Sequence, residues 1–148
     1  MNRVFHRRSL LRTGLALGAS LALPAARACE YFSINLRVTH PWTRATGADA
    51  RYAIVCMKFD AVAQADRLIG VQTPVAEGAE MGGAQAGKAV DFLIPAGQET
   101  VLAEEGTHLR LVGLRFPLEV ARSYPLQLIF ERGGALDATL NVDYLRFG

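Results

Sequence analysis

The chain has 148 residues, with 16 lysines and arginines against 14 aspartates and glutamates, so its formal net charge is +2. This length predicts a single domain. Residues 1–28 hold five of the arginines and no acidic residue, which leaves 11 basic and 14 acidic residues in 29–148 and a net charge of −3 there. Nucleic acid is therefore not an expected partner, because a nucleic-acid-binding domain normally presents a basic surface.

The first predicted element is an export signal in residues 1–28. A basic cluster is followed by the apolar run LALGASLAL and then by Ala26-Arg27-Ala28, a small-residue cleavage pattern. The pair Arg7-Arg8, with leucines two and three positions further on, resembles the twin-arginine export signal. The apolar run is too short to span a membrane. We expect a periplasmic protein without a membrane span, whose one domain comprises residues 29–148.

The chain has two cysteines, Cys29 and Cys56. In the oxidising periplasm, an even number of cysteines predicts a disulfide between them. Two alternatives stay open. Cys29 directly follows the predicted cleavage site, where a lipid-anchored cysteine would lie. Cys56 could instead remain a free thiolate that binds a soft metal.

After residue 28, alternating apolar and polar residues predict strands. Residues 30–40 predict a half-buried strand closed by Pro41, with Phe32, Ile34, Leu36 and Val38 on one face. The apolar run 52–57 predicts a central strand covered on both faces. Further strands are expected at 67–73, 90–95, 98–103, 107–114, 126–131 and 135–145, with a hairpin turn at Gly133-Gly134.

The segment 76–89, AEGAEMGGAQAGKA, is rich in glycine and alanine and predicts a long loop, the usual location of functional residues on a rigid scaffold. Seven to eight short strands with turns between them predict an all-β protein, a β-sandwich of Greek-key type or a small barrel. The sequence contains no nucleophile elbow, phosphate-binding loop or zinc-protease motif, so we do not expect an enzyme.

Thioether, thiol and imidazole side chains suit Cu(I), and the candidates of these kinds after residue 29 are His40, Cys56, Met57, Met81 and His108. Each also has a structural interpretation. Met57 lies in the most apolar run and is expected in the core, and His40 at a strand end is expected to form hydrogen bonds. His108 shares a strand face with Arg110 and lies opposite Leu109 and Leu111. Met81 lies in the predicted loop, where no apolar periodicity predicts burial.

The segments HPWTRAT, RLIGVQTPVAEGAEM, IPAG, GTHLRLVGLRFPLEV and YPLQLIFERGG occur in this order over residues 36–142. Together they resemble the PCuAC-type periplasmic copper chaperones. The resemblance implies a cupredoxin-like β-sandwich that holds one Cu(I). It also implies a copper-accepting periplasmic or membrane protein as partner, because members of this family are associated with copper supply to cytochrome c oxidase.

The resemblance also implies a site of two histidines and two methionines. His108 matches the later histidine, but Arg110 replaces the methionine two residues on, and Gly82 falls at the earlier histidine. We therefore expect a degenerate copper site with His108 and Met81 as ligands, completed by a second copy of the protein or by the extra candidates His40, Cys56 and Met57.

The alternative is a metal-free interaction module. It would use the predicted loop 76–89 to contact a partner protein. In that case Arg110 is expected to pair with Glu77 or Glu80 and so to fix the loop where the family uses a metal.

Overall fold

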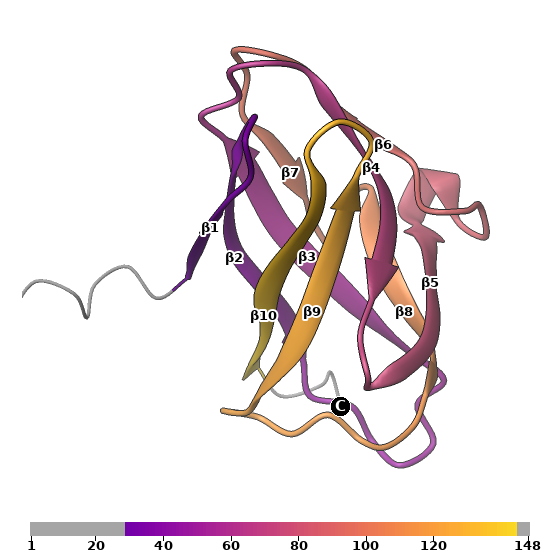
Figure 1. Ribbon diagram of the computed structural model, residues 1–148. Helices are drawn as coiled ribbons and strands as arrows, with labels where there is room; N and C mark the ends of the chain where they lie inside the picture. The colour runs from indigo at the N-terminus through magenta and orange to yellow at the C-terminus, as the bar shows by residue number, and fades with distance from the viewer. Residues whose placement is uncertain (1–28, 145–148) are drawn as a thin grey trace, which may run out of the picture.

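The computed structural model describes residues 29–144 of the chain (Figure 1). This part contains ten strands and one short 3-10 helix. The elements are β1 (Glu30–Phe32), β2 (Arg37–Arg44), β3 (Tyr52–Asp60), β4 (Asp66–Gln72), β5 (Ala76–Gly82), η2 (Gly83–Gln85), β6 (Phe92–Ile94), β7 (Thr100–Leu102), β8 (His108–Leu114), β9 (Ser123–Phe130) and β10 (Gly134–Tyr144). Within the described residues, the structure has no helix with the length and apolarity that crossing a membrane requires.

The strands form a strongly curled sheet in the order β5-β8-β3-β2-β10-β9-β4-β6, and β1 and β7 pair at its side with β2 and β3. All pairs are antiparallel except β2 with β10. Figure 1 shows β10, β9 and β4 in front of β3 and β8, so that the curl produces two facing layers. Buried aromatic and branched side chains fill the space between them. The rings of Phe59 and Phe130 meet edge to face, with their centroids 6.2 Å apart. The predicted β-sandwich is confirmed.

Two strands have the positions and burial that the pattern predicts. The apolar run 52–57 forms the first two thirds of β3, which pairs with β2 on one side and with β8 and β7 on the other. Alternate residues of β10 are buried at Ala138, Leu140 and Val142. The turn at Gly133-Gly134 joins β9 and β10 into an antiparallel hairpin, as predicted.

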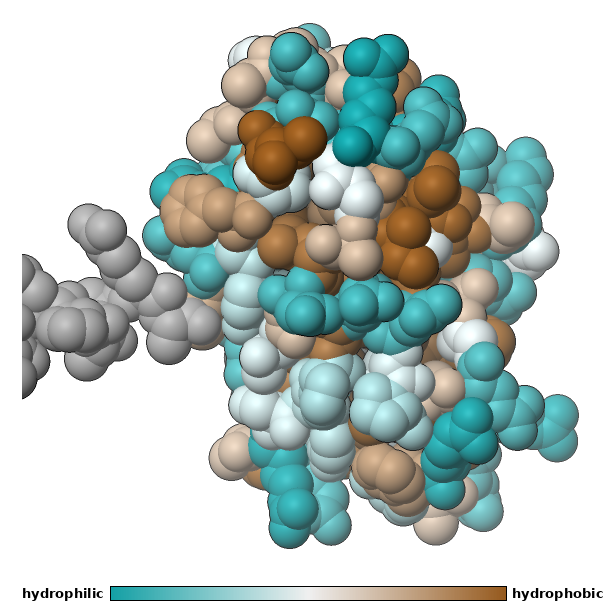
Figure 2. Space-filling view, in the orientation of Figure 1, coloured by the Kyte–Doolittle hydropathy of each residue, from teal (hydrophilic) through white to brown (hydrophobic). Residues whose placement is uncertain are grey.

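The expected single strand at 30–40 is wrong, and β2 also continues through Pro41 to Arg44 instead of ending there. The chain turns at Ser33, whose Oγ accepts hydrogen bonds from the backbone N–H groups of Asn35 and Leu36, and this turn divides β1 from β2. As a result Phe32 and Ile34 are 66% and 81% exposed. Figure 2 shows apolar side chains in brown among polar ones on the face formed by β10, β9 and β4.

The predicted loop 76–89 is also wrong in its first half, because residues 76–82 form β5. Glycine and alanine have low strand propensity, but β5 pairs along its length with β8, and this tertiary pairing overrides the local preference. Only residues 83–89 form an exposed connection. The count of ten strands instead of seven or eight follows mainly from β5 and from the division of β1 and β2.

Asp66 is a buried carboxylate, 3% exposed, that joins three segments. It accepts hydrogen bonds from the backbone N–H groups of Arg67, Arg132 and Gly133 and from the side-chain amide of Asn35, at 2.8–3.1 Å. Burial by itself would raise the pKa of Asp66, but these donors outweigh burial and lower the pKa below its ordinary value. The carboxylate therefore holds the β9–β10 turn against the start of β4.

Candidate metal centre

The candidate site lies where the end of β5 meets the start of β8. In the register of this pair, Gly82 lies opposite His108, Met81 opposite Leu109, and Glu80 opposite Arg110. Side chains alternate between the two faces of a sheet. His108 and Arg110 therefore share one face with the Gly82 position, as the sequence predicts, whereas Leu109 is in the core on the other face.

His108 is almost completely buried, with 4% of its surface exposed. Its Nδ1 lies 3.0 Å from the carbonyl oxygen of Gly106, which can only accept, so Nδ1 carries the hydrogen and donates it. The other ring nitrogen, Nε2, is buried and has no hydrogen-bond partner among residues 29–144. An imidazole fixed through one nitrogen with a free lone pair on the other is the usual arrangement of a metal-binding histidine.

Arg110 lies beside His108 and also has an unpartnered buried atom, its Nε, within the described part of the chain. Its guanidinium lies 4.7 Å from the centre of the Tyr52 ring, a cation–π contact. The expected ion pair with Glu77 or Glu80 is not formed: none of the ion pairs between described residues includes Arg110. A guanidinium donates no lone pair and repels a cation, so Arg110 opposes metal binding at His108.

Neighbouring side chains occupy the space that a side chain at position 82 would need. A Cβ at this position would lie 2.3 Å from His108 Nε2 and 2.8 Å from Arg110 Nε, closer than atoms can approach without moving. Both unpartnered nitrogens therefore face the Gly82 backbone. A metal ion that binds His108 Nε2 has to enter this space, which requires Arg110 to move.

Met81 is not brought to His108. It is 1% exposed and lies in the core on the face of Leu109, because it is one residue removed from Gly82 along a strand. A shift of one residue would be harmless in a flexible loop, but in β5 it reverses the side of the sheet. The expectation of Met81 as a recruited ligand depended on the loop, and the strand removes that basis.

The three further candidates lie in structural positions. Met57 is 2% exposed and belongs to the core, as its structural interpretation predicts. His40 Nε2 contacts Asp143 Oδ2 at 2.5 Å and so has a carboxylate partner. Cys56 is 2% exposed, and burial raises the pKa of its thiol to about 12, so it stays protonated and is a poor metal ligand. Among residues 29–144, no three histidine, cysteine, aspartate or glutamate side chains are grouped to hold a metal.

The expected disulfide is not present, since both Cys29 and Cys56 are free thiols in the structure. Cys29 is partly exposed next to β1, and its sulfur lies 4.0 Å from the side-chain amide nitrogen of Asn141. The predicted export signal lies outside the described residues.

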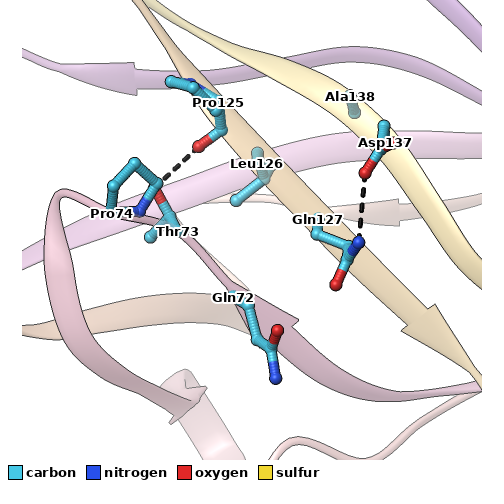
Figure 3. A pocket seen from close by; sticks show the side chains of 8 residues that line it. All are labelled: Gln72, Thr73, Pro74, Pro125, Leu126, Gln127, Asp137 and Ala138. Atoms are coloured by element: carbon cyan, nitrogen blue, oxygen red, sulfur yellow. Dashed lines mark hydrogen bonds between the residues drawn. The ribbon is translucent and has the colours of Figure 1, made fainter.

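Two surface depressions are lined by residues other than His108, Arg110 and Gly82. One of about 460 Å³ is lined by Gln72, Thr73, Pro74, Pro125, Leu126, Gln127, Asp137 and Ala138 (Figure 3). Figure 3 shows two of its hydrogen bonds, from Thr73 to the Pro125 carbonyl and from Gln127 to Asp137, and it contains no metal-binding histidine, cysteine or methionine. A second, of about 470 Å³, is lined in part by Tyr52, Ile54 and Glu104. It reaches the candidate site through Tyr52, the ring under Arg110.

Sequence reasoning missed two residues of this site. Tyr52 supports Arg110, but it belongs to another strand, and the sequence offered no signal that the two residues meet. Gly106 supplies the carbonyl that fixes His108, and its position in the turn two residues before His108 was a usable signal.

The fold defines the class of protein: a β-sandwich with the fold of PCuAC domains. The structure of a copper-bound PCuAC domain from PmoF2 superposes with a TM-score of 0.71 at 24% identity, over 78% of this chain and 97% of that one. An apo PCuAC domain from PmoF1 superposes with a TM-score of 0.71 at 26% identity, over 78% of this chain and 98% of that one. The Cu(I) form of DR1885 from Deinococcus radiodurans superposes with a TM-score of 0.62 at 22% identity, over 81% of this chain and 83% of that one.

The sequence family is shown directly. Residues 36–142 match the family described as "Putative lipoprotein LpqE-like". The chain belongs to this LpqE-like family. A search of curated proteins found no match.

Proposed function

We propose that this protein is an exported copper-binding protein that holds Cu(I) through His108 and passes it to another protein. The observation that carries the proposal is the state of His108. Its ring is held by a hydrogen bond at Nδ1, and its Nε2 is buried without a hydrogen-bond partner among residues 29–144, within a fold shared with domains that were solved with copper. Nothing in the proposal requires catalysis.

A single imidazole does not hold Cu(I) tightly, because this ion takes several soft ligands. The neighbours of His108 on its face of the β5–β8 pair are Gly82, which has no side chain, and Arg110, which cannot ligate. The remaining donors therefore come from the molecule that gives or receives the ion. This arrangement suits brief transfer better than storage, and we propose an acceptor among periplasmic or membrane proteins, with cytochrome c oxidase assembly as the destination that the resemblance implies.

Two finer points belong to the same proposal. Export through residues 1–28, with dependence on Arg7 and Arg8, remains our prediction. The description of the matched family as a lipoprotein also supports the lipid anchor on Cys29, since the structure leaves this thiol without a disulfide partner. The intact mass of protein isolated from the cell envelope distinguishes a lipid-modified Cys29 from a free one.

A Cu(I) competition titration tests the proposal. The purified protein is titrated against a chromogenic Cu(I) chelator, and the His108→Ala variant is titrated beside it. We expect His108→Ala to lose Cu(I) binding, whereas His40→Ala, which removes the other histidine of the described residues, leaves it unchanged. Equal binding by wild-type protein and His108→Ala would place copper elsewhere and exclude the proposed site.

The second candidate function is the metal-free interaction module, which Gly82 and Arg110 favour because neither supplies a metal ligand. The structure restricts its contact segment. Residues 76–82 are occupied as β5, so a partner would meet the exposed residues 83–89. Absence of Cu(I) binding by the wild-type protein would favour this function.

A further inference from the structure

Three glycines at and just after the end of β5 differ in the space around the position where a side chain would lie. Gly82 has φ −129° and ψ 174°, an extended conformation that any residue can adopt, so only the lack of a Cβ matters there. Gly83 has φ +78° and Gly87 has φ +84°, both in the region that favours glycine. A Cβ on Gly87 would meet nothing within 4 Å, whereas a Cβ on Gly83 would lie 2.2 Å from the carbonyl oxygen of Gly106.

The two crowded glycines lie against different groups that hold His108. Gly82 faces the ring edge, since its missing Cβ would lie 2.3 Å from Nε2 and 2.5 Å from Cδ2. Gly83 faces the Gly106 carbonyl, which accepts the hydrogen bond from Nδ1. The ring can stay where it is only while position 82 has no side chain. The carbonyl can reach Nδ1 only while position 83 has none.

We propose that Gly82 and Gly83 are positioning residues for His108. They form a cradle that fixes its rotamer and its tautomer, with the hydrogen on Nδ1 and the lone pair on Nε2. The cradle thereby selects Nε2 as the nitrogen that a soft metal would bind. This inference rests on the proposed function for its purpose, but the cradle itself exists in the metal-free protein and is tested there.

The experiment measures the tautomer of His108 by long-range ¹H–¹⁵N correlation spectra of metal-free, ¹⁵N-labelled protein at pH 8, where an ordinary histidine is neutral. We expect the wild-type protein to show the Nδ1–H tautomer. Gly87→Ala is the matched control, because it imposes a positive φ on alanine without touching the cradle, and it should keep the wild-type pattern.

Gly82→Ala and Gly83→Ala should each lose the single Nδ1–H form and populate the Nε2–H form. A general loss of stability would not change the tautomer in the cradle variants alone, because Gly87→Ala imposes a backbone strain similar to that of Gly83→Ala. If both cradle variants keep the wild-type tautomer, the proposal is overturned. If Gly83→Ala does not fold, Gly82→Ala decides, and an Nε2–H tautomer in the wild-type protein alone would already contradict the cradle.

The result is independent of the copper titration. A cradle that fails this test leaves the effect of His108→Ala on Cu(I) binding intact. A protein that binds no Cu(I) can still show the cradle, in which case the positioning is real and the proposed function is wrong.

Discussion

Asp66 and His108 are both almost fully buried polar side chains, yet their surroundings are opposite. The Asp66 carboxylate accepts four hydrogen bonds, and three of them join it to the β1–β2 and β9–β10 turns. The His108 ring has one hydrogen bond, and its Nε2 is buried without a partner among the described residues. The Nε of the neighbouring Arg110 is buried without a partner there as well. A fully satisfied buried group is explained by stability, whereas an unsatisfied one carries a cost that stability does not explain.

The largest expected effect is on Asp66. Replacing it by alanine leaves three backbone N–H groups and the Asn35 amide without their acceptor, so we expect the free energy of unfolding to fall by roughly 3–5 kcal/mol. Urea denaturation followed by circular dichroism measures this. Asp137→Ala is the control, because this exposed carboxylate only accepts from Gln127. If Asp66→Ala lost no more stability than Asp137→Ala does, Asp66 would not stabilise the fold in the way proposed here.

The next effect concerns Cys56, a buried group that stays neutral. With a pKa of about 12 instead of 9.0, its thiol forms about a thousandfold less thiolate near pH 8 than an ordinary cysteine. We expect iodoacetamide to label Cys29, unless it is lipid-modified, and to label Cys56 only after unfolding, as measured by peptide mass spectrometry. Rapid labelling of native Cys56 would contradict its neutral, buried state and would reopen it as a metal ligand. A Cys29–Cys56 disulfide in this experiment would restore the expectation from the sequence.

A smaller effect is the dependence of stability on pH. The pKa of Asp66 is lowered in the folded protein, so its contribution is present above the ordinary aspartate pKa and is lost as pH falls through the lower folded value. Stability should therefore decrease below about pH 4. Asp66→Asn should lose less stability over this range than the wild-type protein does. Unfolding curves at several pH values compare the two, and identical slopes would exclude this role of Asp66.

The sequence predicted the strands whose apolar residues form a continuous run or a clear alternation. β3 is apolar on nearly every residue and β10 alternates cleanly, so both were located correctly. Residues 76–82 lack large apolar side chains, and their strand exists because β8 pairs with them. Local composition cannot report a distant partner strand, and the loop prediction failed for this reason.

The candidate site shows the same division. Alternation along 107–114 correctly put His108 and Arg110 on one face. It could not show that the face is covered, that Arg110 lies on Tyr52 instead of an acidic partner, or that His108 fills the space above Gly82. Met81 was misplaced because the error about β5 changed a tolerant loop position into the wrong face of a strand.

The smallest expected effect, and the most direct test of the central claim, is the Cu(I) affinity of Arg110→Met. This change removes the repelling cation from the face of His108 and supplies a thioether at the same strand position. We expect the affinity in the chelator titration to rise by about tenfold or more, equivalent to at least about 1.4 kcal/mol. Arg115→Met, just beyond β8, is the control and should change nothing. The gain should disappear in the double variant Arg110→Met with His108→Ala. Unchanged Cu(I) affinity in Arg110→Met would show that the His108 face is not a copper site and would contradict this account.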